Sequence, residues 1–173
     1  MRGDEQGDVQ APDPHGLIAE ILAAIAYGER CGAARSLSSV VLAPDGRRRE
    51  AQVHIADRER QNWELVQARV AELGGEALTE RFKPYFDAFF AHTEPADWIE
   101  AQTFHYVGDA LVSDFADILV PLVDMVSAEI VRRALGDRED QEVFALDELT
   151  GALRADPSVA DRIAMTQAWE RNR

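Results

Sequence analysis

The chain has 173 residues, the size of one domain, and 46% of them are hydrophobic, which is enough for a substantial core. Its 32 Asp and Glu residues outnumber 18 Lys and Arg residues, and the formal net charge of −14 argues against binding to a phosphate backbone. One cysteine excludes a disulfide framework, and the absence of a long apolar run excludes a membrane span and a secretory signal, so we expect a cytoplasmic protein.

The long segments predict an all-α protein. They are rich in Ala, Leu, Glu, Arg and Gln, which favour helices, and no alternation of apolar and polar residues persists as it would in a strand. Residues 1–14 are dominated by Gly, Asp, Gln and Pro and are predicted to be a disordered leader. Residues 15–173 are predicted to form a single helical bundle domain.

Turn and capping signals divide this domain into helices. Pro44-Asp45-Gly46 predicts a turn, and Gly74-Gly75 predicts a helix end. Thr93 can cap a helix whose first turn contains Pro95, and Val120-Pro121-Leu122 is a later interruption. In chain order, the predicted helices cover residues 15–42, 47–73, 78–92, 94–119, 123–153 and 156–173.

The helix lengths predict the topology. Four long helices with short connections inside each pair, and a long crossover between the second and third, are typical of a four-helix bundle with one long connection. The last helix is additional. The crossover contains the short helix 78–92, whose five aromatic residues predict a lid packed over one end of the bundle.

Acidic residues lie inside the apolar faces of these helices. Glu29 falls on the stripe that contains Leu22, Ile25 and Ala26, at the spacing of one helical face. Burying an ionised carboxylate there costs several kcal/mol unless a cation or a hydrogen-bond donor compensates. Glu59 occupies the matching position on the second helix. These two acids predict a polar or metal-binding site inside the bundle.

The third and fourth long helices extend this pattern. Asp109 is the inward acid of the third helix, and His105 lies one turn before it. The fourth helix has two possible inward stripes, so the identity of its acid stays open among residues 137–142. Dinuclear iron and manganese sites in bundles use a Glu from each of two helices and Glu-x-x-His from each of the other two. Here Glu59-x-x-Asn62 and Asp137-x-x-Asp140 depart from that His pattern.

Four short motifs resemble the ferritin-like superfamily. They are Tyr27-Gly28-Glu29, Asp97-Trp98-Ile99-Glu100, Tyr106-Val107-Gly108-Asp109 and Leu135-Gly136-Asp137. The similarity runs from about Gly16 to Ile163 and points to the bacterial branch likened to the tRNA hydroxylase, whose parent enzymes are non-haem di-iron monooxygenases. The resemblance implies a ferritin-like bundle and two iron ions, or one manganese and one iron. The candidate ligands, from their positions on the helices, are Glu29, Glu59, Asn62, Asp109, Asp137 and Asp140, with His105 as a replacement ligand or a partner of Asp109.

Two functions remain open at this stage. In the first, two metal ions activate dioxygen for a hydroxylation or related oxidation, and an external reductase supplies electrons because the sequence has no flavin or nicotinamide motif. In the second, the protein is a metal-free ferritin-like scaffold that acts through homodimerisation or partner binding. A metal-free core would require some of the acids to be protonated or paired with Arg. The net charge argues against a tRNA substrate in either case.

Overall fold

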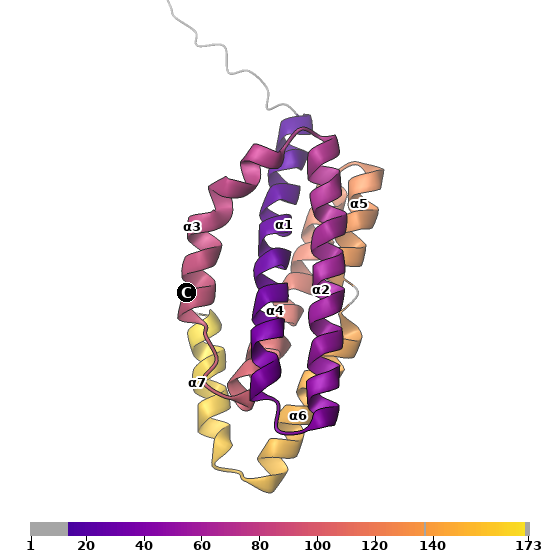
Figure 1. Cartoon of the computed structure of the whole chain (residues 1–173). Helices are drawn as coiled ribbons and strands as arrows, with labels where there is room; N and C mark the ends of the chain where they lie inside the picture. Colours follow the sequence, from indigo (N-terminus) through magenta and orange to yellow (C-terminus); the bar gives the residue numbers. More distant parts are fainter. Residues whose placement is uncertain (1–13, 137, 172–173) are drawn as a thin grey trace, which may run out of the picture.

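The computed structural model describes residues 14–136 and 138–171, with side chains described for 15–136 and 138–166. The prediction of an all-α bundle is confirmed for the described residues, and Figure 1 shows the helices running along a common long axis. The helices are α1 (Pro14–Ser39), α2 (Gly46–Glu72), α3 (Glu76–His92), α4 (Trp98–Leu119), α5 (Met125–Val131), α6 (Glu139–Ala155) and α7 (Val159–Arg171). Residues Val40–Leu42 and Val120–Leu122 form 3-10 turns, and Arg132–Gly136 form a π-helical segment.

The bundle is built from two helical hairpins. Helices α1 and α2 form one hairpin, and α4 pairs with the broken run of α5, the π-helical segment and α6 (Figure 1). The crossover helix α3 runs along the side of α1, and α7 packs against α4. The shared core includes Leu22, Ala26, Val66, Val70 and Val131, all inaccessible to solvent. No described helix is both long and apolar enough to cross a membrane.

The predicted helix 123–153 is wrong as a single element. Asp124 caps α5 by accepting hydrogen bonds from the backbone N–H groups of Val126 and Ser127. The chain then passes through the π-helical segment, and Arg138, with φ −122° and ψ 3°, leaves the helical region before α6 begins. A π-helical segment inside a helix is often associated with a functional site. Arg138 is the non-helical residue at this break.

Two smaller corrections concern the crossover. Thr93 ends α3, donating its hydroxyl to the Phe89 carbonyl, while Asp97 caps α4 by accepting from the backbone N–H groups of Ile99 and Glu100. The aromatic helix α3 lies along α1 rather than over an end of the bundle (Figure 1). Its Phe86 ring packs against Tyr27 of α1, and Phe89 and Phe90 pack against Phe104 of α4. The predicted leader, as far as residue 13, lies outside the described residues. Pro14 is already the first residue of α1.

Candidate metal and charge cluster

Three of the predicted acids converge on Arg138, which the sequence analysis did not include. Arg138 is 4% exposed, and its guanidinium forms an ion pair with Glu29. Its Nη1 lies 2.8 Å from Oδ1 of Asp109 and 3.8 Å from Oε1 of Glu59. Its Nη2 also donates to the Ala134 carbonyl at 3.0 Å. One guanidinium thus holds acids from α1, α2 and α4 together.

The break in the fourth long helix places this guanidinium. Arg138 stands at the start of α6 with a non-helical backbone, and its carbonyl accepts the first hydrogen bonds of that helix, from Gln141 and Glu142. In the preceding π-helical segment, the Ala134 carbonyl receives side-chain donors instead: Arg138, and Asn62 of α2 at 3.2 Å. Polar side chains thereby satisfy a backbone group that the widened helix leaves available.

The positive charge of Arg138 does not fully offset the cost of burying these acids. Burial raises the pKa of Glu29 from its ordinary 4.5 to about 7, although the charge of Arg138 acts to lower it. Burial likewise raises the pKa of Glu59 to about 7, against the lowering effects of His105 and Arg138. Burial acts to lower the pKa of Arg138, but Glu29, Asp109 and Glu59 raise it overall, so the guanidinium stays charged.

Each of the three acids also retains an oxygen that no described residue satisfies. Oε2 of Glu29, Oε2 of Glu59 and Oδ2 of Asp109 are buried and have no hydrogen-bond partner within the described part of the chain. Buried carboxylate oxygens normally have donors or cations as partners. The unsatisfied oxygens therefore mark a place for a proton or a cation.

A chain of polar side chains reaches the cluster from the other side. His105 is 3% exposed, and its Nε2 lies 3.0 Å from Nε2 of Gln52 and 3.5 Å from Oγ of Ser36. Oε1 of Gln52 accepts from Gln102 at 3.2 Å, so the Gln52 amide nitrogen is the donor toward His105. These amides fix the orientation of the imidazole next to the acids.

The remaining predicted residues lie elsewhere. Asn62 is buried, but its amide donates to the Ala134 carbonyl. Asp140 is exposed on α6 and does not join the cluster, because the break in the helix turns it toward the surface. Asp137 lies outside the described residues. The inward residue that α6 contributes to the cluster is thus the cation Arg138, where an acid was predicted.

A sequence signal for Arg138 exists. It precedes the first turn of the last part of this helix, two helical turns before Ala145 and three before Leu149, and both of these residues are buried. The sequence predicted an acid from this helix, so the cation on its apolar stripe was missed. Gln52 is similar, since it extends the stripe of Ile55, Ala56 and Glu59 by one turn and is completely buried.

The geometry distinguishes one metal ion from two. Ligand atoms of Glu59, His105 and Asp109 all lie within 4.8 Å of one another, close enough for a single ion to contact all three. Two carboxylates and an imidazole suit a divalent iron or manganese ion, and both acids keep an unsatisfied oxygen. A dinuclear centre does not fit, because the guanidinium of Arg138 lies between Glu29 and Asp109, where a second ion would need those carboxylates.

Comparison with known proteins agrees with this architecture. A family model described as a ferritin-like domain of actinomycetes matches residues 14–172. The matched range includes every helix of the bundle and every residue of the cluster. No curated protein matches the chain.

Proposed function

We propose that this chain, which belongs to the family described as a ferritin-like domain of actinomycetes, binds a single divalent transition-metal ion through Glu59, His105 and Asp109. Arg138 takes the place of the second ion of a dinuclear centre. The observation that carries the proposal is the convergence of ligand atoms of Glu59, His105 and Asp109 within 4.8 Å of one another. Glu59 and Asp109 each also keep a buried oxygen without a hydrogen-bond partner among the described residues.

Charge balance supports the same site. Three carboxylates face one guanidinium, so the ionised acids exceed Arg138 by two negative charges. A divalent cation would offset this excess, and so would protons on Glu29 and Glu59, whose pKa values are both raised to about 7. Metal and protons therefore compete for the cluster, and we expect binding to strengthen as the pH rises through this range.

The residues around the ion would have separate roles. Arg138 holds Asp109 while it neutralises Glu29. An ion bound at Nδ1 of His105 would require the ring proton on Nε2, with the Gln52 amide turned so that its oxygen, in place of its nitrogen, faces the ring. An iron ion at this site would supply oxygen-dependent oxidation, with electrons from an external reductase. Membership of the branch that resembles the tRNA hydroxylase, and location in the cytoplasm, remain predictions from the sequence. The net charge of −14 argues against a tRNA substrate.

The Arg138 contacts also favour a second candidate, a metal-free ferritin-like scaffold. Arg138 satisfies one oxygen of Glu29 and one of Asp109, and Gln52 already occupies Nε2 of His105. In this candidate the cluster is a neutralised polar core that holds the helices in register, and the protein acts through homodimerisation or partner binding. The two candidates differ in one measurable quantity, the metal content.

We would test the proposal on the full chain, produced in medium rich in iron and manganese and purified without chelators. Elemental mass spectrometry should find about one ion per chain, since three protein ligands define one site. Asp109→Asn should lose the ion, because the amide removes an anionic ligand. Glu64→Gln on the exposed face of α2 is the matched control and should retain it.

The other outcomes are equally informative. A folded chain with almost no metal in the wild type would contradict the proposed site and favour the scaffold. About two ions per chain, both lost in Asp109→Asn, would contradict the placement of Arg138 as the replacement for an ion. Titration of the metal-free chain with Co²⁺, followed by its visible absorption, provides a second measurement that does not depend on growth conditions.

A further inference from the structure

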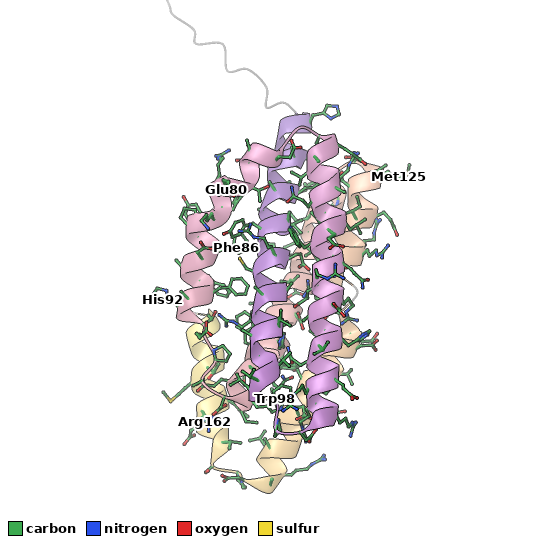
Figure 2. The ribbon with its side chains drawn as sticks, viewed as in Figure 1. Glu80, Phe86, His92, Trp98, Met125 and Arg162 are labelled. Atoms are coloured by element: carbon green, nitrogen blue, oxygen red, sulfur yellow. The ribbon has the colours of Figure 1, made fainter. Side chains whose placement is uncertain are left out.

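An apolar pocket of about 380 Å³ lies between α1 and α4. Ile21, Ala24 and Gly28 line it from α1, and Val112 and Phe115 from α4. Phe86 of α3 and Leu135 of the π-helical segment close it, and Figure 2 shows the Phe86 side chain on the face of α3 turned toward α1. Every residue that lines the pocket is apolar.

Small residues on α1 create the space. Ala24 and Gly28 are one helical turn apart and line the pocket together with the larger side chains of Phe86, Val112 and Phe115. A Cβ at Gly28 would lie 3.0 Å from Cε1 of Phe86, so only glycine lets this ring approach α1 so closely. The Phe86 ring also packs against Tyr27, with centroids 5.9 Å apart. The wall formed by Phe86 is therefore held in place from two sides.

The size and lining indicate the class of ligand. A pocket of 380 Å³ is more than twice the roughly 150 Å³ cavity that accepts benzene, and it falls in the usual range for small-molecule sites. Without a donor or acceptor in its lining, the pocket offers nothing to a polar group. The net charge of −14 disfavours an anion such as a fatty acid.

We propose that this pocket binds a neutral hydrocarbon-like molecule, an alkyl chain or a fused aromatic ring. The apolar surface continues outward over Leu111, Phe115 and Ile118, which are 45%, 56% and 60% exposed, so a longer chain can extend along α4. Burial of this apolar surface supplies the binding free energy.

The pocket is adjacent to the charge cluster. Gly28 directly precedes Glu29, Val112 lies one turn beyond Asp109, and Leu135 belongs to the segment that leads to Arg138. A bound molecule would therefore contact residues that neighbour the cluster along the chain. Its oxidation would rest on the proposed function, whereas its binding requires only the pocket.

The test uses the full chain freed of metal by a chelator, so that it is independent of the metal site. Titration with 1-aminoanthracene, followed by its fluorescence, should show saturable binding. Decanol should displace the probe, and decanoate should displace it more weakly. Ala24→Phe fills the pocket and should weaken binding at least about tenfold. Ala34→Phe, an exposed position on the same helix, is the matched control and should bind like the wild type.

A second pocket-filling variant, a folding check and a measurement of the oligomeric state separate filling of the pocket from misfolding and from dimerisation. Val112→Phe fills the same pocket from α4, and circular dichroism verifies that each variant is folded. Absence of saturable binding to the wild type, or equal binding by folded Ala24→Phe, Val112→Phe and Ala34→Phe, would overturn the proposal. A dimer in sedimentation velocity that Ala24→Phe dissociates, without probe binding to the wild type, would also overturn it, because a second copy would then cover the pocket. Probe binding without metal binding would refute only the proposed function.

Discussion

Arg138 is the residue on which the polar core depends. Its guanidinium lies among three buried acids and is itself almost inaccessible to solvent. A buried ion pair is not by itself evidence of stability, since desolvation offsets much of the attraction. Removing one partner is different, because it leaves the others as uncompensated buried charges. Arg138 has three such partners.

We expect Arg138→Gln to destabilise the metal-free protein by about 3–5 kcal/mol near neutral pH, because three buried acids lose their cation. Urea denaturation in the presence of a chelator measures this loss. Arg133→Gln, an exposed Arg of the π-helical segment, is the control and should change stability by less than about 0.5 kcal/mol. Equal stability of the two variants would contradict the assigned role. Recovery of Arg138→Gln on addition of Mn²⁺ would support the metal site.

At the scale of single elements, helix ends decide where the functional residues lie. The fourth long helix is interrupted by its π-helical segment, and the interruption turns Arg138 inward and Asp140 outward. Helix α4 begins at Trp98 because Asp97 satisfies two backbone N–H groups of its first turn, at 2.9 Å and 3.1 Å. This cap fixes the start of the helix that contributes His105 and Asp109.

Asp97→Ala should lower the free energy of unfolding by about 1 kcal/mol, the usual effect of losing an N-cap side chain. Asp97 also forms an ion pair with Arg162 of α7. Both side chains of this pair are largely exposed, so Arg162→Ala should cost little and separates the two effects. Asp114→Ala, at an exposed position inside α4, is the matched control. A loss in Arg162→Ala as large as that in Asp97→Ala, by thermal or urea denaturation, would refute the cap as the cause.

At the scale of the whole molecule, some of the excess acidic residues are buried in the core. Glu29 has a pKa of about 7 in the folded chain, above its ordinary 4.5, because burial disfavours its ionised form. Between these values the folded state binds more protons than the unfolded state, so the contribution of Glu29 to stability falls as the pH rises. Below pH 4.5 Glu29 is protonated in both states, and its contribution to stability no longer changes with pH. Above about pH 7 it is ionised in both states, and the full cost of burying its charge lowers the free energy of unfolding.

We therefore expect the metal-free protein to lose stability between about pH 4.5 and 7, with part of the slope caused by Glu29. Glu29→Gln keeps the shape of the side chain and removes its titration. The stability difference between the wild type and this variant should change by a few kcal/mol across the window, in favour of the variant at the higher pH. Urea denaturation at several pH values measures it. Parallel curves for the two proteins would show that Glu29 does not titrate there.

The sequence predicted the bundle because its signals are local. Apolar positions at helical spacing, Pro44-Asp45-Gly46 and Gly74-Gly75 determine where the first hairpin turns and ends, and the structure follows them to within a few residues. The same periodicity indicated that Glu29, Glu59 and Asp109 face inward, and all three are buried. A carboxylate on an apolar stripe is readable because its position on the helix face is fixed by the local geometry of the helix.

Only the tertiary structure decided what these acids face. The continuous helix predicted over residues 123–153 would have offered an acid to the cluster, whereas the break before α6 supplies the guanidinium of Arg138. Sequence periodicity assumes unbroken helical geometry, so it cannot place side chains beyond a π-helical segment. The compensation of a buried charge is a property of residues far apart in the chain. The sequence by itself therefore determined that charges are buried, and the packing of four helices decided which cation neutralises them.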